Sequence, residues 1–174
     1  MEILYDVPAM DMANSPTGCC PVFDPSAWDG KVFCFERLRF VQATTRSFFY
    51  MPLDMSSVMT RSQQQIRDAG AEISDRYLML SRDVSKWRAY HYFMVSKDVF
   101  EMPSADLPGH YYAKVYEGPY QNMSRWYKDL QETVTRQGMK ADEFLSFYTT
   151  CPKCAKTYGK NHVVLFARVK EHDR

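Results

Sequence analysis

The sequence predicts an α+β fold built from two strand-helix-strand-strand units that join into one antiparallel sheet with both helices on one face. Segments with strand-like and helix-like spacing of apolar residues follow one another in the same order twice along the chain. Pro52 and Pro119 stand just before the two predicted helices, and Gly70 and Gly138 stand just after them, at a spacing of 67 or 68 residues. This spacing predicts a tandem duplication.

The chain of 174 residues is predicted to form one domain preceded by an irregular arm. Four prolines interrupt residues 1–43, so this arm is expected to hold at most one strand, near residues 32–40, and to pack on the domain. The domain itself is predicted over residues 44–174. Its first unit covers about 44–96 and its second about 107–170.

The first unit begins with a predicted strand at residues 44–51. A helix is predicted at residues 54–69, with Asp54 placed to cap its first turn. Two strands, 76–81 and 88–95, follow as a hairpin. The apolar residues of the helix share one face: Met55, Val58, Met59, Ile66 and Ala69.

The second unit repeats this order with a strand at residues 110–117 and a helix at residues 120–137. Two further strands are predicted at residues 143–150 and 162–169. The helix presents one apolar stripe that should be buried against the sheet. Its members are Met123, Trp126, Tyr127, Leu130 and Val134.

Strand alternation assigns side chains to the two faces of the predicted sheet. The helix side is expected to carry mainly small and aliphatic residues: Ala89, Phe93, Val95, Ala113, Val115, Leu145, Phe147, Val163, Leu165 and Ala167. The opposite face is expected to carry aromatic residues: Tyr90, Tyr92, Tyr112, Tyr116, Tyr148 and Phe166. Such a face is either a ligand cleft, with Trp87 at its rim, or a second core covered by the arm.

Charge and targeting signals exclude several classes of partner. The chain has 22 basic and 21 acidic side chains, so its net charge of +1 gives no support for nucleic-acid binding. The first residues lack the basic start of a signal peptide, and no run of about eighteen apolar residues could span a membrane. We therefore expect a cytoplasmic protein without membrane association, and the sequence makes no prediction about its oligomeric state.

The five cysteines form the sharpest local pattern in the sequence. An odd number without a secretion signal argues against a disulfide framework. Cys151 and Cys154 have the spacing of a zinc knuckle, and further ligands are expected from Cys19 or Cys20, whose adjacent side chains should diverge, or from His162. The alternatives are structural thiols and a redox pair, the latter disfavoured because no helix is predicted to start at the pair. No other cofactor is expected.

Three segments carry a resemblance to a known family. The sequence VYEGPY at 115–120, within the duplicated arrangement over about 44–170, resembles the GyrI-like small-molecule-binding domain, which also forms the effector-binding domain of multidrug-sensing transcription regulators. The sequences CCPVFDPSAWD at 19–29 and CPKCAKTYGKN at 151–161 resemble a stand-alone bacterial subgroup that is often labelled hydrolase. No DNA-binding helix-turn-helix accompanies them, so the regulator role is not expected.

The resemblance implies a cleft between the two units that binds hydrophobic, amphipathic or cationic aromatic small molecules. For some stand-alone members it also implies hydrolytic opening of reactive, cyclopropane-bearing genotoxic compounds. Many members place a glutamate where this chain has Ser146, so recognition of a cation by that position is not implied here.

The sequence identifies no catalytic group through a motif, because triad, metalloprotease and phosphate-binding patterns are absent. Glu117 and Tyr116 are the candidates for assisting water attack on a bound electrophile. Alternation places Glu117 on the helix side at a strand end, where an acid also suits the helix N-terminus. The alternative function is a non-catalytic module that sequesters ligands or binds a protein, as a gyrase inhibitor does. Turnover of a bound electrophile would separate these functions.

Overall fold

The computed structural model describes residues 1–11 and 13–171, so the predicted end of the domain at 172–174 lies outside the described residues. The helices are α1 (Met55–Asp68), α2 (Met123–Arg136) and α3 (Pro152–Tyr158), with 3-10 turns η1 (Pro25–Ala27) and η2 (Tyr120–Asn122). The strands are β1 (Ile3–Leu4), β2 (Val32–Cys34), β3 (Arg39–Phe48), β4 (Met51–Pro52), β5 (Met79–Ser85), β6 (Arg88–Val95), β7 (Ser104–Ala105), β8 (His110–Glu117), β9 (Met139–Tyr148) and β10 (His162–Glu171).

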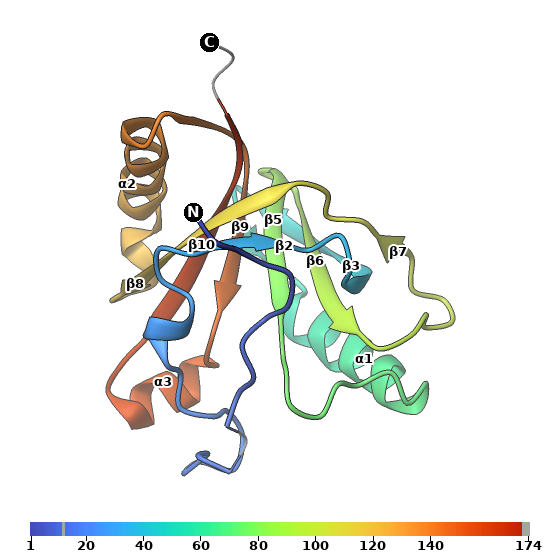
Figure 1. Ribbon diagram of the computed structural model, residues 1–174. Helices are drawn as coiled ribbons and strands as arrows, with labels where there is room; N and C mark the ends of the chain where they lie inside the picture. Colours follow the sequence, from blue (N-terminus) through green and yellow to red (C-terminus); the bar gives the residue numbers. More distant parts are fainter. Residues whose placement is uncertain (12, 172–174) are drawn as a thin grey trace.

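The strands form one mixed, mostly antiparallel sheet in the order β1-β2-β8-β10-β9-β5-β6-β3-β4, with β7 paired to β3 (Figure 1). Each half of the chain runs strand, helix, strand, strand: β3-α1-β5-β6, then β8-α2-β9-β10. The halves meet where Ser81 of β5 pairs with Ser146 of β9. The predicted α+β class is confirmed, although the sheet is not wholly antiparallel because the arm adds β1 parallel to β2.

The two long helices occupy the predicted segments, with α1 starting at Met55 and α2 at Met123. Asp54 is the N-cap residue of α1, but its carboxylate accepts a hydrogen bond from the backbone N–H of Arg46 at 2.8 Å instead of capping the helix. Before α2 the chain turns at Gly118, whose φ of 141° favours glycine. A Cβ there would also lie 3.4 Å from the Trp126 ring.

Both long helices lie on the same face of the sheet. α2 buries Trp126 in a cluster with Leu165 of β10, and α1 buries Ile66 in a cluster with Phe93 of β6. Residues that pair directly across neighbouring strands project to the same face. One row of such pairs carries the helix face across the sheet: Leu165–Ser146, Ser146–Ser81, Ser81–His91 and His91–Ala43.

The N-terminal arm covers the opposite face of the sheet (Figure 1). Trp28 is 2% exposed, and its ring centroid lies 5.4 Å from those of Phe33 and Phe147. The regular part of the fold begins earlier than expected, because β3 starts at Arg39 and pairs with β6 from that residue onward. The predicted boundary at 43/44 therefore falls inside a strand. The aromatic residues of the arm buried in this cluster are Phe23, Trp28, Phe33 and Phe35.

The predicted faces are correct for β6 and β10 but wrong for β8 and β9. Tyr112, Tyr116 and Tyr148 lie on the helix side, whereas Ala113 and Leu145 lie beneath the arm, as does Phe147. Both sides of these strands are covered by apolar layers, so alternation separates two sets of residues without showing which set meets the helices. The six aromatic residues therefore do not converge on one face.

Candidate functional site

A cavity of about 110 Å³ lies between the two halves on the helix side of the sheet, near the junction of β5 with β9. Many of the side chains around it are polar, although residues beneath helices are usually apolar. The lining residues are Thr45, Ser47, Tyr50, Pro52, Met55, Ser81, Asp83, Ala89, His91, Tyr127, Ser146 and Tyr148.

His91 stands at the base of this cavity, on β6, and is 3% exposed. Its Nδ1 lies 2.8 Å from the Ser81 hydroxyl and its Nε2 lies 2.8 Å from the Thr45 hydroxyl. Burial lowers the pKa of His91 to about 4, so the imidazole is neutral at physiological pH. A neutral imidazole held by two hydroxyls fixes the polar floor of the cavity.

Asp83 and two tyrosines share the same cavity. Asp83 is exposed as a whole residue, yet desolvation by the surrounding protein raises the pKa of its carboxyl. Burial also raises the pKa of Tyr127 and of Tyr148, and the neighbouring Tyr148 raises that of Tyr127 further. The Ser146 hydroxyl opposes both shifts, and the Asp83 charge adds a still smaller rise to each pKa. These mutual effects place one carboxyl and two protonated phenols within electrostatic reach of each other.

Exposed aromatic residues flank the cavity at the β3–β4 hairpin and the β5–β6 turn. We call Phe48, Phe49, Tyr50 and Trp87 the mouth aromatics; each is between 49% and 59% exposed. The ring centroids of Phe49 and Trp87 lie 5.1 Å apart. Tyr50 also lines the cavity, and a backbone hydrogen bond from Ser47 to Trp87 joins the turn to the cavity wall. Trp87 was predicted at the rim of a cleft on the aromatic face, and that role in ligand binding stays a prediction.

Tyr116 supports α2 instead of lining the cavity. Its ring stacks on Trp126 with centroids 5.4 Å apart, and its hydroxyl donates to Asp129 Oδ2 at 2.7 Å. Lys114 donates to the same oxygen at 2.6 Å and lowers the pKa of Asp129. Burial, followed by the contact with Asp129, raises the pKa of Tyr116. The hydroxyl proton of Tyr116 is therefore engaged in the hydrogen bond to Asp129.

The remaining predicted aromatic residues are spread over both faces. Tyr92 and Phe166 are 5% and 0% exposed and pack in the core beneath the arm, with Tyr90 partly buried against it. Tyr112 is buried in the cluster around α2, where its hydroxyl accepts a hydrogen bond from Gln137. Among the predicted ligand-binding residues, Tyr148 lines the cavity and Trp87 flanks it.

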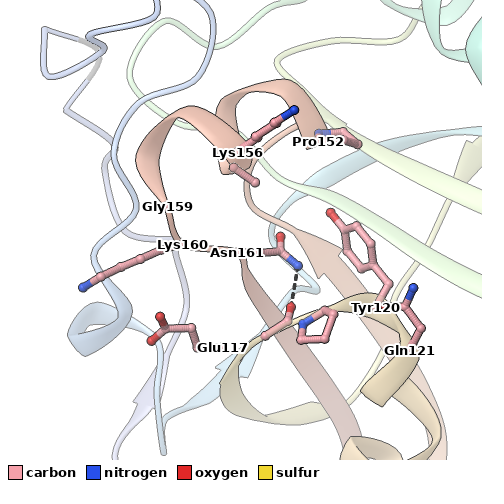
Figure 2. Close-up of a pocket in the computed structure, with 11 residues that line it drawn as sticks. Glu117, Tyr120, Gln121, Pro152, Lys156, Gly159, Lys160 and Asn161 are labelled. Atoms are coloured by element: carbon pink, nitrogen blue, oxygen red, sulfur yellow. Dashed lines mark hydrogen bonds between the residues drawn. The ribbon is translucent and has the colours of Figure 1, made fainter.

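A second, open groove of about 460 Å³ lies between the turn at Gly118 and helix α3 (Figure 2). Glu117 stands at its edge, exposed, with Oε2 3.7 Å from His162 Nε2. The predicted helix side is wrong for Glu117, because it alternates with Tyr116 and so projects toward the arm. Asn161 donates to the Gly118 carbonyl at 2.8 Å, and Figure 2 shows Glu117 directed away from Tyr120.

Four of the five cysteines come together beside α3. The sulfurs of Cys19, Cys20, Cys151 and Cys154 all lie within 4.8 Å of one another. The expectation that adjacent cysteines diverge is wrong, since the sulfurs of Cys19 and Cys20 are 3.7 Å apart. The expectation that no helix starts at the pair is also wrong, because Cys151 is the N-cap of α3. This cluster could hold a metal ion, whereas His162 is not a member of it.

Sequence reasoning did not single out Asp83, His91 or Tyr127 as site residues. Asp83 falls in the expected hairpin turn, but β5 continues to Ser85 with an irregularity between Asp83 and Ser85. Tyr127 belongs to the apolar stripe of the predicted helix and lines the cavity from there. The sequence feature that could have indicated the cavity is the presence of the polar residues Ser81 and His91 inside otherwise apolar strands.

These features define a class: an α+β protein with one sheet, two helices on one face and a small polar cavity where its halves meet. The chain belongs to the bacterial hydrolase family, whose family model matches residues 10–169. That range includes most of the arm, both halves of the sheet and the four clustered cysteines. No curated protein matches the chain. In the described part of the chain, no helix combines the length and apolarity needed to cross a membrane.

Proposed function

We propose that this protein hydrolyses small aromatic electrophiles in the cavity between its two halves, as a GyrI-like small-molecule-binding protein. The observation that carries the proposal is that Asp83, Tyr127 and Tyr148 surround one cavity together with the Ser146 hydroxyl. Membership of the bacterial hydrolase family supports the reaction class.

Asp83 is the proposed general base. Desolvation raises its pKa, which makes the ionised carboxylate a stronger base than an ordinary aspartate and better matched to removing a proton from water. In the described structure Asp83 has no ion-pair partner within 4.0 Å, so its lone pairs remain available. His91 does not compete for this role, because both of its ring nitrogens are already engaged by hydroxyls.

Tyr127 and Tyr148 are the proposed hydrogen-bond donors to the developing negative charge. Their raised pKa values keep both phenols protonated at neutral pH, so each can donate to an oxygen that becomes negative during the reaction. For a cyclopropane ring fused to a dienone, water attacks a ring carbon and Asp83 accepts the proton of the water. The adjacent ring C–C bond breaks, its electron pair moves to the dienone oxygen, and a tyrosine stabilises the resulting phenolate through a hydrogen bond. The phenolate then takes a proton from solvent, and Asp83 releases the proton of the attacking water to solvent.

The size of the cavity limits what enters it. A volume of about 110 Å³ suits a reactive group, whereas sites for whole drug-sized molecules span roughly 300–1,000 Å³. The mouth aromatics offer flat, exposed rings on which the remainder of an aromatic substrate can stack. The proposed substrate therefore combines a compact electrophilic end with a flat aromatic body.

A spirocyclopropyl dienone probe tests the proposal, with the ring-opened phenol measured by chromatography in single-turnover reactions. We expect Asp83→Asn to slow the reaction about 100-fold or more, with binding measured by equilibrium dialysis unchanged. The matched control is Asp106→Asn, an exposed acid on the loop before β8, which should keep the rate of the original protein. A full rate in Asp83→Asn would remove Asp83 from the mechanism.

Sequestration without chemistry is the second candidate, and the mouth aromatics are the observation that favours it. In that case the probe binds with an affinity that depends on Trp87 and is released unchanged. After incubation with excess protein, the probe should then be recovered intact, with no more loss than in buffer alone. This result would establish sequestration over hydrolysis.

A further inference from the structure

We propose that Cys19, Cys20, Cys151 and Cys154 bind one zinc ion that fastens the N-terminal arm to helix α3. A tetrahedral zinc ion with Zn–S bonds of about 2.3 Å holds its four sulfurs about 3.8 Å apart. All four sulfurs already lie within 4.8 Å of one another, and those of Cys19 and Cys20 are 3.7 Å apart. Small side-chain adjustments therefore complete a four-thiolate site.

The local backbone explains how two short segments deliver four ligands. Cys151 is extended at φ −67° and ψ 157°, and Pro152 then begins α3, so Cys154 returns to the same side within the first turn. On the arm, Gly18 has a φ of 68° and turns the chain immediately before Cys19. The two segments belong to opposite ends of the chain and lie side by side below the sheet in Figure 1.

Hydrogen bonds around the cluster connect the arm segment to helix α3. The Thr17 hydroxyl lies 3.2 Å from Cys154 Sγ and 2.9 Å from the Tyr158 hydroxyl. Tyr158 donates in turn to the Cys20 carbonyl. Contacts of this kind orient ligands around metal sites and are found beside bound thiolates. Four thiolates around Zn²⁺ leave the site a net charge of −2.

The arrangement favours a metal over the other uses of cysteine. Disulfides would draw the sulfurs into two separate pairs, whereas here all four converge on one point. Tetrahedral sulfur sites select zinc or iron, and a cluster of several irons would need its ligands spread around a larger body. Because all four positions are thiolates, no position is open to water, so the proposed ion is structural and lies apart from the cavity.

The ion would also determine the position of α3. The opposite side of this helix lines the open groove through Pro152, Ala155 and Lys156. Cys154 is 1% exposed, so the ligand side of the helix is its buried side. Loss of the metal should therefore release α3 and the arm loop together, while leaving the cavity near Asp83 in place.

Metal analysis of the full chain, purified under reducing conditions without chelator, tests the proposal. We expect about one equivalent of zinc per chain. Cys19→Ser and Cys154→Ser should each retain less than about one fifth of that amount at the same protein concentration after dialysis. Cys34→Ala is the matched control, because this buried cysteine of β2 lies outside the cluster, and it should retain full zinc.

Two further measurements keep the test decisive if Cys154→Ser folds poorly. Titration of the metal-free protein and of Cys19→Ser with Co²⁺ should give the intense visible absorption of a four-thiolate site in the first protein only. Hydrogen exchange after chelation should increase in residues 13–24 and 151–160 and stay unchanged at β5 and β9. Iron in place of zinc, a disulfide among the four cysteines, zinc retained by Cys19→Ser, or no zinc after refolding with the ion would each overturn the assignment.

Discussion

The two faces of the sheet are covered in different ways. Beneath the arm, Trp28, Phe33, Phe35 and their neighbours form a dense aromatic layer. Beneath the helices, Thr45, Ser81, His91 and Ser146 are buried polar residues at the junction of the halves. The sequence left open whether the predicted aromatic face is a ligand cleft or a second core. Tyr92 and Phe166 of that set pack in the core beneath the arm, whereas Tyr148 lies on the helix side and lines the cavity. Buried polar side chains that surround a cavity are the feature on which the proposed site rests.

The largest expected loss of stability follows replacement of a buried tryptophan by alanine. The chain has one tryptophan beneath the arm, one beneath α2 and one at the mouth of the cavity. Trp28→Ala beneath the arm and Trp126→Ala beneath α2 should each cost about 3–5 kcal/mol of unfolding free energy, because each leaves a large cavity. Trp87→Ala, at a 49% exposed position, should cost less than about 1 kcal/mol. Urea unfolding of the three variants checks this. A small loss in Trp28→Ala would mean that the arm is not an integral layer of the core.

The second prediction concerns pH and the polar face. The pKa of His91 falls from 6.5 to about 4 on folding, so its contribution to stability is complete above pH 6.5 and is lost as pH falls toward 4. Between pH 6.5 and 4, His91 becomes protonated in the unfolded chain but stays neutral in the folded chain. This difference lowers the unfolding free energy by about 3 kcal/mol. His91→Gln should lack this component. Equal pH dependence of unfolding in both proteins would contradict the neutral buried imidazole.

Removal of the Tyr116 hydroxyl is expected to cause a smaller loss of stability. Tyr116→Phe keeps the ring on Trp126 but removes the hydrogen bond to Asp129, which should cost about 1 kcal/mol. Tyr50→Phe, at an exposed position, is the control and should be neutral within about 0.5 kcal/mol. Thermal unfolding of both variants measures the difference. Reduced turnover of the dienone probe in Tyr116→Phe at unchanged stability would restore Tyr116 as a catalytic candidate.

The smallest effect on stability should accompany a clear effect on binding. Phe49→Ala removes an exposed ring that stacks on Trp87, so unfolding should change by less than about 0.5 kcal/mol. If the mouth aromatics hold the flat part of a ligand, affinity for the dienone probe should fall about tenfold. Equilibrium dialysis with Phe100→Ala as control, an 88% exposed ring on another loop, measures this. Unchanged affinity would place ligand contact elsewhere.

The order of elements was predictable because it depends on local patterns. Helix periodicity and the glycines at 70 and 138 located α1 and α2 within a few residues. The face of β8 was not predictable in the same way, since Tyr112 and Tyr116 are as suited to the underside of a helix as to a ligand cleft. That choice was determined by the Trp126 ring, which stacks on Tyr116, and no local pattern contains this contact.

The cysteine cluster also shows what local sequence patterns can and cannot predict. The spacing of Cys151 and Cys154 indicated a metal knuckle, and the need for further ligands pointed to Cys19 or Cys20. That both adjacent cysteines reach one point depends on the turn at Gly18 and on Thr17 contacting Cys154. Such pairings across the whole chain follow from the tertiary fold, so the sequence alone could offer candidates but not the complete set.

The sheet ends at both sides in strands of two residues, β1 at Ile3–Leu4 and β4 at Met51–Pro52. Unpaired edge strands are templates on which other chains can add, and short strands or a proline without an N–H reduce that risk. A row of strands this wide is thereby protected against end-to-end polymerisation. The outermost strand at each border is thus too short to give another chain a long backbone ladder to extend.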